Sequence, residues 1–313
     1  MRIVFFGSPA AALPALDRLI GAGHMIVLVV TQPDKPAGRG RKPAASPVKR
    51  SAVERGLPVF DPARIRKDES ALGRIRDARP DVNVVVAYGQ IIPEPIIDLP
   101  RWHSLNVHFS LLPKYRGAAP VARTLLEGDP DTGVTIIELN ARMDEGDILS
   151  QVRTPVGPGE TASELEARLA VLGADLLLET LGRIDTVAHV PQDHSLATLA
   201  PKIRVQEARI DWREPAERVD RRVRAMSTKP GAFTFFRGRR IIIRRGRDLA
   251  LPAEGGRPGE VLAVGREGLR TACGGGTTYL VESLQPEGKT AMTAHAFSLG
   301  AGIAPGKVFE SPS

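Results

Sequence analysis

Short apolar runs alternate with helix-like stretches through residues 1–181 of this 313-residue chain. Runs such as Met25–Val30 lack a polar residue at every second position, which is typical of strands covered on both faces of a parallel sheet. Between the runs, apolar residues recur at helical spacing, as they do in Leu13–Ile20. The alternation predicts an α/β domain with a doubly wound, mostly parallel sheet. The expected strands are Met1–Phe6, Met25–Val30, Pro58–Phe60, Val82–Val86, Leu105–His108, Val134–Glu138 and Ile148–Val152.

The pattern changes at Thr186. Residues Thr186–Glu207 show no sustained hydrophobic period, and we interpret them as a linker. A short basic helix is expected at Ala216–Ala225, and short strands separated by glycine-rich turns follow it, which is typical of a small β-barrel. The sequence therefore predicts domains at 1–185 and 208–313, joined by a linker at 186–207. The five expected strands are Ala232–Phe236, Arg239–Ile243, Glu260–Val264, Gly268–Ala272 and Thr277–Leu284.

Positive charge is concentrated in the last third of the chain. The whole chain carries 43 Lys/Arg and 36 Asp/Glu, which gives a formal net charge of +7. Residues 205–313 contain 18 of the Lys/Arg and 12 of the Asp/Glu, a net charge of +6. A basic domain indicates a polyanionic partner, although it is equally consistent with a solvated surface.

Composition excludes several classes of protein. Cys273 is the only cysteine, so neither an intrachain disulfide nor a cysteine cage for a metal can form. No apolar run approaches the roughly 20 residues of a membrane helix, and residues 1–7 lack the basic start followed by a long apolar run that is typical of a signal peptide. We expect a cytoplasmic protein with no membrane association.

Two nucleotide-binding motifs are absent. Gly7 is followed by Ser8, Pro9 and two alanines, so the first expected strand does not lead into G-x-G-x-x-G, and no lysine-bearing phosphate loop occurs. The first turn therefore argues against NAD or ATP as a ligand.

The segment Thr31–Arg50 is unusually basic. We interpret it as one long loop, which is uncommon inside a compact domain and is usually functional or disordered. Its charge suits phosphate contacts, and the alternative is a solvated surface loop. The basic residues, with no acid between them, are Lys35, Arg39, Arg41, Lys42, Lys49 and Arg50.

Three polar residues form a candidate catalytic set. Asn106 and His108 lie two apart at the end of an expected strand, so their side chains should project to the same side. The glycine-containing loop Asn140–Asp147 can bring Asp144 to the same sheet edge. An amide donates to an oxyanion, an imidazole moves a proton near neutral pH, and a carboxylate orients the imidazole. No serine or cysteine nucleophile is needed if the substrate supplies an amine.

This part of the chain resembles the 10-formyltetrahydrofolate-dependent formyltransferases. Asn106-x-His108 is followed by SLLPKYRG at Ser110–Gly117, and the acidic loop ends in DEGD at Asp144–Asp147. The similarity extends over essentially the whole chain to members that act on methionyl-initiator tRNA. It implies a Rossmann-like catalytic domain and a C-terminal OB-like barrel. Supporting segments are QPDKPAGRG at 32–40, SPVK at 46–49, PQD at 191–193, SLAT at 195–198 and ARIDW at 208–212.

The resemblance also implies roles for individual residues. Asn106 and protonated His108 would stabilise the oxyanion, and His108 with Asp144 would move the amine's proton, through a water, toward the departing folate nitrogen. The implied co-substrate is 10-formyltetrahydrofolate, with no metal, since no cluster has ligand spacing. The implied folate contacts are Ser110, Leu111, Leu112 and Pro113, with Gln90, Ile91, Ile92, Leu139 and Asn140 around the pterin. The implied partner is methionyl-initiator tRNA, and we expect the protein to be a monomer. The implied tRNA contacts are Lys35, Arg39, Arg41, Lys42, Lys49, Arg221 and Arg222.

Two other functions stay open at this point. One is another folate-dependent formyl enzyme, which would act on an amino sugar or hydrolyse formyltetrahydrofolate with the same catalytic set. The other is a non-catalytic RNA-binding protein on an enzyme scaffold, against which the intact catalytic set argues. The basic loop and the basic C-terminal third favour tRNA. The chain departs from the family pattern at Phe109, where proline or a small residue is common, and at Ser227–Pro230, where an Asn-Pro-Trp-Pro-like turn is usual.

Overall fold

The computed structural model describes residues 1–37, 42–253 and 255–312. The chain divides into two compact units, each built from more than one segment of sequence. The first unit comprises Met1–Pro120, Asp131–Pro155 and Glu166–Pro201. The second comprises Val121–Pro130, Val156–Leu165 and Lys202–Ser313.

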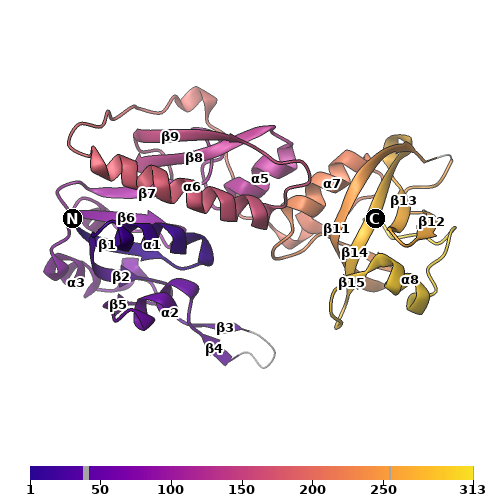
Figure 1. Ribbon diagram of the computed structural model, residues 1–313, viewed down its shortest axis with the longest axis horizontal. Coiled ribbons are helices and arrows are strands. Elements are labelled where there is room, and N and C mark those ends of the chain that lie inside the picture. Colours follow the sequence, from indigo (N-terminus) through magenta and orange to yellow (C-terminus); the bar gives the residue numbers. More distant parts are fainter. Residues whose placement is uncertain (38–41, 254, 313) are drawn as a thin grey trace. The chain divides into compact units, whose positions relative to one another are not determined.

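The first unit is built on a seven-stranded sheet with the order β5-β2-β1-β6-β7-β8-β9 (Figure 1). Strands β5 to β7 of this order are parallel to one another, whereas β8 is antiparallel to both β7 and β9. The prediction of an α/β fold with a mostly parallel sheet is confirmed. The strands are β1 (Arg2–Gly7), β2 (Met25–Val30), β5 (Val59–Phe60), β6 (Val82–Val86), β7 (Ser104–His108), β8 (Asp131–Glu138) and β9 (Ile148–Pro155).

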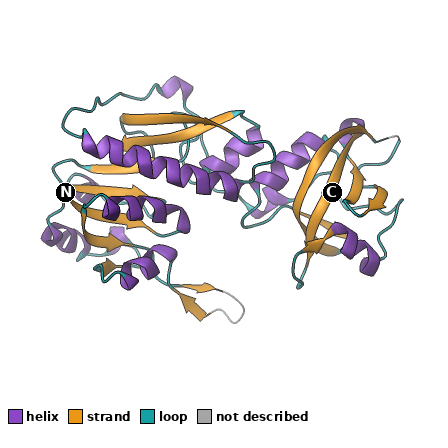
Figure 2. Cartoon of the chain, viewed as in Figure 1, coloured by secondary structure: helices purple, strands orange, loops and turns teal. Residues whose placement is uncertain are grey.

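Helices cover both faces of this sheet, because alternate residues of a buried strand point to opposite sides. On one face, Phe6 of β1 packs with Ile75 of α3 in an apolar cluster. On the other, α6 approaches so closely that a Cβ on Gly173 would lie 2.7 Å from the Val107 side chain. Helices α1 and α6 lie on the same side of the sheet (Figure 2). The helices of the first unit are α1 (Leu13–Gly21), α2 (Pro47–Glu54), α3 (Ala71–Ala78), α4 (Glu94–Ile97) and most of α6 (Ala162–Gly182), whereas α5 (Pro120–Glu127) lies almost wholly in the second unit.

The basic segment Thr31–Arg50 is not one long loop, so that prediction is wrong. Lys35–Ala37 (β3) and Lys42–Ala44 (β4) pair as an antiparallel hairpin, and Pro47–Glu54 form α2. The Ser46 side chain caps the helix by accepting a hydrogen bond from the backbone three residues on. The proline after it takes the first helical position, where a missing N–H costs nothing. This Ser-Pro pair was the sequence signal for a helix.

The second unit contains an antiparallel sheet with the order β10-β11-β14-β13-β12, and β15 pairs with β14. The C-terminal antiparallel sheet agrees with the prediction. Among the described residues, no pairing of β10 with β12 closes the sheet into a barrel. The elements are α7 (Ala216–Ala225), β10 (Phe233–Phe236), β11 (Arg239–Pro252), β12 (Val261–Gly265), β13 (Gly268–Ala272), β14 (Thr277–Pro286), β15 (Met292–Thr293) and α8 (Ala294–Ala301).

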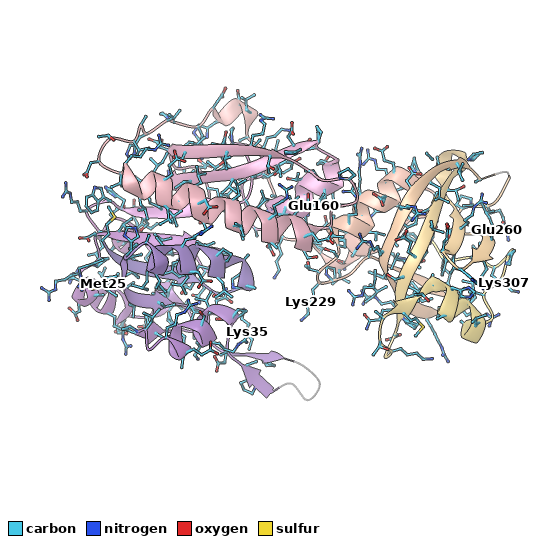
Figure 3. The ribbon with its side chains drawn as sticks, viewed as in Figure 1. Met25, Lys35, Glu160, Lys229, Glu260 and Lys307 are labelled. Atoms are coloured by element: carbon cyan, nitrogen blue, oxygen red, sulfur yellow. The ribbon has the colours of Figure 1, made fainter. Side chains whose placement is uncertain are left out.

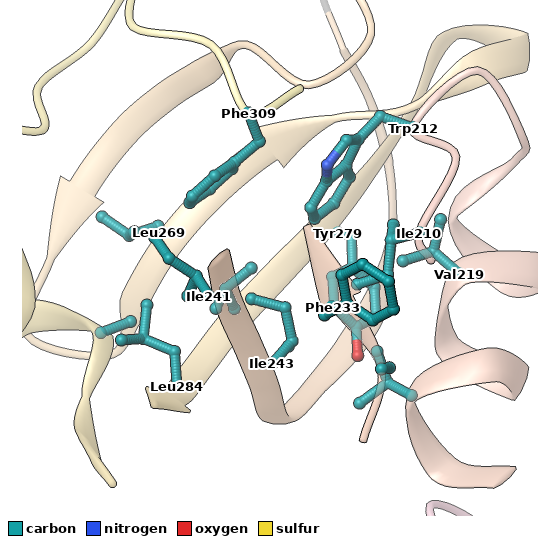
Figure 4. Close-up of a cluster of buried hydrophobic side chains, with 14 of the residues drawn as sticks. Ile210, Trp212, Val219, Phe233, Ile241, Ile243, Leu269, Tyr279, Leu284 and Phe309 are labelled. Carbon is teal, nitrogen blue, oxygen red and sulfur yellow. The ribbon is translucent and has the colours of Figure 1, made fainter. Parts of the chain in front are cut away.

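Trp212 lies in the core of the second unit (Figure 4). Its ring stacks on Phe309, with the centroids 5.5 Å apart, and lies 6.4 Å from Tyr279. The indole Nε1 donates to Thr234 Oγ1 at 3.0 Å, so the one polar group of this buried side chain is satisfied. The antiparallel sheet therefore has its own apolar core.

Cys273 belongs to the same core, and burial raises the pKa of its thiol to about 12. At pH 8 only about one thiol in 10⁴ is then the reactive thiolate. We expect iodoacetamide to modify the native chain at least about 100-fold more slowly than the chain unfolded in guanidinium, as measured by mass spectrometry. Similar rates in the two states would contradict this burial.

No helix within the described ranges is both long enough and apolar enough to cross a membrane.

Candidate active site

Asn106 and His108 lie near the centre of the sheet and face one side of it. Asn106 pairs with Val85 of β6, and Val85 pairs with Phe6 of β1, so these residues share one face. His108 is the last residue of β7, so it lies at the carboxyl ends of the parallel strands, where ligands bind in open α/β folds. His108 is buried and Asn106 half-buried. The predicted common direction of the two side chains is confirmed.

Asp144 reaches both side chains from the loop between β8 and β9. Its Oδ1 lies 3.5 Å from Asn106 Nδ2, and its Oδ2 lies 3.7 Å from His108 Nδ1. The backbone N–H of Gly117 donates to Oδ2 at 2.8 Å. The φ angle of Asp144 is 54°, a left-handed conformation that costs a non-glycine residue about 1–3 kcal/mol. Contacts elsewhere must therefore hold this loop in place.

The His108 ring has an oxygen acceptor on each side. Its Nε2 lies 2.9 Å from the Tyr115 carbonyl, which can only accept, so Nε2 carries a hydrogen. Its Nδ1 faces the Asp144 carboxylate. When the ring is doubly protonated, both N–H groups point to acceptors, so this arrangement suits an imidazole that takes up a proton and then returns it.

The segment Ser110–Pro113 leaves β7 and is held by polar side chains of the neighbouring strands. Thr135 Oγ1 donates to the Ser110 carbonyl at 2.6 Å and accepts from Leu112 N at 3.1 Å. Gln151 Nε2 donates to the Leu112 carbonyl at 3.0 Å. The Ser110 hydroxyl donates to a carbonyl of the same turn. These bonds fix the backbone of the turn without any ligand.

Some of the residues expected around the pterin have structural roles. Gln90 accepts from the backbone of Ile65 at 2.9 Å and donates to the carbonyl of Pro62 at 3.1 Å, so its side chain braces a neighbouring loop. Ile92 is buried in the apolar cluster of the first unit, whereas Ile91 is 59% exposed. The other two are Leu139, half-buried against the same cluster, and Asn140, which is exposed.

In the first unit, the cations expected to contact tRNA include one that is already paired. Lys49 Nζ lies 2.6 Å from Asp34 and 2.7 Å from Asp61, and hydrogen bonds to these carboxylates raise the pKa of Lys49. Lys35, at the base of the hairpin, is exposed and donates to Gln32 (Figure 3). Lys42 belongs to β4, and Arg39 and Arg41 lie outside the described residues.

In the second unit, both cations expected to contact tRNA are paired. Arg221 forms an ion pair with Glu217, one helical turn away, and donates to the Glu127 carbonyl at 3.0 Å. Arg222 forms an ion pair with Glu214. These contacts reduce the charge that either guanidinium can offer to a phosphate.

Two buried residues beside the site carried no predicted role. Arg116 donates to Gln192 Oε1 from Nε at 3.0 Å and from Nη2 at 2.8 Å. Gln192 Nε2 donates to the Asp144 carbonyl at 2.9 Å and to the Gly146 carbonyl at 2.7 Å. Both residues stand in segments that support the family resemblance. The spacing of these two residues in the sequence does not indicate that they bind each other or the Asp144 loop.

The two departures from the family pattern are accommodated locally. Phe109 is buried, and a Cβ on Gly173 of α6 would lie 3.6 Å from its ring. In the turn Ser227–Pro230, the Ser227 hydroxyl accepts from the backbone N–H of Ser163 at 3.1 Å.

Comparison with known proteins identifies the class. Residues 1–181 match the family described as formyl transferase, and residues 202–302 match its C-terminal domain. The chain belongs to the formyltransferase family. The methionyl-tRNA formyltransferase of Thiobacillus denitrificans is 44% identical over 306 residues, with 98% of each chain covered. That of Thermus thermophilus is 47% identical over 306 residues, again with 98% of each chain covered.

Solved structures with a similar fold are more distant. HypX from Aquifex aeolicus in complex with tetrahydrofolic acid is 18% identical, with a TM-score of 0.65 that covers 95% of this chain and 47% of that one. The N-formyltransferase from Helicobacter canadensis in complex with folinic acid and dTDP-3-aminofucose is 16% identical, with a TM-score of 0.65 and coverage of 91% and 98%. At these identities the likeness concerns the fold alone.

In the part of the chain that the structure describes, no group of three or more His, Cys, Asp and Glu side chains could hold a metal ion.

Proposed function

We propose that this chain transfers the formyl group of 10-formyltetrahydrofolate to the free α-amine of methionyl-initiator tRNA, giving N-formylmethionyl-tRNA for translation initiation. The observation that carries the proposal is the meeting of Asn106, His108 and Asp144 at the end of β7. An amide donor, an imidazole and a carboxylate are the groups that acyl transfer to an amine needs. Relatives named methionyl-tRNA formyltransferase align with 98% of the chain.

In this mechanism the methionyl amine forms a bond to the formyl carbon, and the bond from that carbon to the folate nitrogen breaks. Asn106 Nδ2 donates to the formyl oxygen while it bears negative charge, and the positive charge of protonated His108, whose two N–H groups face Tyr115 and Asp144, aids it. His108 and Asp144, through a water, move the proton from the attacking amine to the departing nitrogen. Asp144 keeps the imidazolium oriented, since its Oδ2 lies 3.7 Å from Nδ1.

The residues proposed for the folate fit a flat, partly apolar ligand. Ile91 exposes 59% of its surface, and Leu139 is half-buried, so both have apolar surface that a pterin could cover. The turn Ser110–Pro113 is preformed by its bonds to Thr135. Since the Ser110 hydroxyl is already bonded, we assign Ser110 to shaping the turn rather than to a new hydrogen bond. Leu111, Leu112, Pro113, Gln90, Ile92 and Asn140 complete the proposed set.

For the tRNA, we propose contacts from the hairpin segment and from the second unit. The Gln32 backbone N–H donates to the Ser8 hydroxyl, next to β1, and its side-chain amide donates to the Tyr88 carbonyl, next to β6, so the hairpin starts at the sheet edge that holds the site. Lys35, Arg39, Arg41, Lys42, Lys49, Arg221 and Arg222 remain the proposed cations. Among the exposed cations for which no ion pair is seen within the described residues, Arg218, Lys229 (Figure 3) and Arg239 suit phosphates better than the paired ones.

Salt should weaken this interaction strongly. With about six phosphate contacts, the affinity for methionyl-tRNA should fall about 10³-fold between about 50 and 200 mM salt, because each contact releases counterions. Arg239→Ala should lower the slope of log affinity against log salt by about one. Arg76→Ala, an exposed cation on α3, is the matched control and should leave the slope unchanged. A flat salt dependence of the unsubstituted chain would remove the polyanion assignment.

We also propose that residues 208–313 form an OB-like barrel that binds tRNA, that 1–185 form the catalytic domain and that 186–207 link them. The end of the chain supports the barrel, because it bridges both edges of the antiparallel sheet. Phe235 of β10 forms a bridge with Glu310, and Glu260, next to β12, forms one with Val308. We expect the protein to act as a cytoplasmic monomer.

Radiolabelled formyl transfer tests the function directly. With labelled 10-formyltetrahydrofolate, methionyl-initiator tRNA should become labelled, whereas an amino-sugar nucleotide should not, and little free formate should form. Labelling of the sugar alone, or release of formate alone, would replace the proposed function with another folate-dependent formyl enzyme. Absence of both folate binding and transfer would leave only an RNA-binding protein.

A further inference from the structure

The backbone of the Asp144 loop needs support from outside the loop. Asp144 is in a left-handed conformation, and a Cβ on Gly146 would lie 1.6 Å from the Glu138 carbonyl, so the chain is tightly constrained there. The loop must nevertheless place Asp144 Oδ2 within 3.7 Å of His108 Nδ1. A small rotation of this backbone would move the carboxylate away from the ring.

Gln192 supplies that support from the far side of the loop. It is 5% exposed. Both hydrogens of its amide have acceptors, the carbonyls of Asp144 at 2.9 Å and Gly146 at 2.7 Å. Its Oε1 accepts twice from Arg116, at 3.0 and 2.8 Å. The Gln192 amide is therefore fully bonded and has no freedom to turn.

Arg116 connects this clamp to the other two catalytic side chains. It is 5% exposed, and Glu145 lies 3.5 Å from its guanidinium as the counter-charge. The carbonyl of Tyr115, its predecessor, contacts His108 Nε2, and the N–H of Gly117, its successor, donates to Asp144. Three consecutive residues thus fix the imidazole, the loop clamp and the carboxylate.

We propose that Gln192, held by Arg116, is a positioning residue for formyl transfer: it clamps the Asp144–Gly146 backbone so that the carboxylate stays against His108. It touches neither substrate in this assignment and acts through Asp144. The inference rests on the proposed function for its kinetic readout. A merely structural role would instead lower stability without a selective loss of turnover.

Two substitutions at Gln192 separate the clamp from general packing. Gln192→Met keeps the length of the side chain and removes all four hydrogen bonds. Gln192→Glu keeps the oxygen that pairs with Arg116 and removes the donors to the Asp144 and Gly146 carbonyls. A matched control is Asn83→Leu, which removes another buried amide that donates to two oxygens, at 2.8 and 2.9 Å. Asn83 lies opposite the first residue of β7, whereas His108 is the last.

The experiment measures kcat and both KM values, thermal unfolding, and the ¹⁵N NMR signals of the His108 ring. Both Gln192 variants should lower kcat about 10- to 100-fold, because a shift of about 1 Å in a catalytic group has that effect, with each KM within about threefold. The His108 signals should shift in both. Asn83→Leu should lower stability while kcat stays within about threefold and the His108 signals stay in place.

Three results would overturn the assignment: a Gln192→Glu kcat within about threefold of the unsubstituted chain, a comparable kcat loss in Asn83→Leu, or unmoved His108 signals in both Gln192 variants. Failure of the proposed function is distinguishable from these. It would appear as no transfer by the unsubstituted chain, and the NMR comparison would still report whether Gln192 holds Asp144 against His108.

Discussion

Asp144→Ala should lower the kcat of formyl transfer at least about 100-fold while methionyl-tRNA binding is nearly unchanged. The substitution removes the carboxylate that faces His108 Nδ1 and Asn106 Nδ2, at 3.7 and 3.5 Å. The imidazolium then loses its oriented counter-charge at the step in which the proton moves. Steady-state kinetics with labelled folate, together with tRNA binding by filter retention, measure the two quantities.

Asp144→Asn is the control for that prediction. It keeps an oxygen that can accept from Gly117 N, so the loop keeps this contact, but it removes the charge. A large kcat loss in this variant assigns the effect to the charge rather than to the loop. Asn106→Ala and His108→Ala should each lose about two decades as well. Any of these variants that stayed within about fivefold of the unsubstituted kcat would exclude that residue from the mechanism.

Trp212→Ala should lower the free energy of unfolding of the second unit by about 3–5 kcal/mol. The side chain is fully buried, stacks on Phe309 and donates to Thr234, so the substitution opens a cavity and leaves a buried hydroxyl without its donor. Urea unfolding followed by far-UV circular dichroism measures the loss, because the signal does not depend on the substituted indole.

Trp102→Ala provides the comparison, since Trp102 is the chain's other tryptophan and is only half-buried, in the first unit. Its substitution should cost about 1 kcal/mol or less. A loss below about 1 kcal/mol for Trp212→Ala would mean that the indole does not support the core of the second unit.

Elements with a clear period were predictable from the sequence. Met25–Val30 became an interior strand, because a strand buried on both faces favours an unbroken apolar run, and Val82–Val86 became another although it contains the polar Asn83. The segment Thr31–Arg50 was not predictable by that route. Its prolines and basic residues have no period, and the helix inside it is marked only by a Ser-Pro cap. Composition therefore suggested a loop where the chain forms a hairpin and a helix.

Within the candidate site, the sequence was informative where chemistry depends on residue type. The common direction of the Asn106 and His108 side chains was predictable, because residues two apart on a strand project from the same face. The ion pairs of Lys49 with Asp61 and of Arg222 with Glu214 were not predictable, because these residues come into contact only after the chain folds. A count of basic residues therefore overstated the charge that these positions can offer to RNA.

The class of the fold and the chemical groups of the site could be predicted without the structure, since hydrophobic period and residue type are properties of short segments. The way in which Asp144 is held depends on contacts that form only in the folded chain. Arg116 and Gln192 are 76 positions apart, and the tripeptide around Arg116 fixes His108 and Asp144 through backbone atoms that every residue possesses. Contacts made by backbone atoms across such distances leave no pattern in residue identity, because they arise only when the sheet brings the segments together.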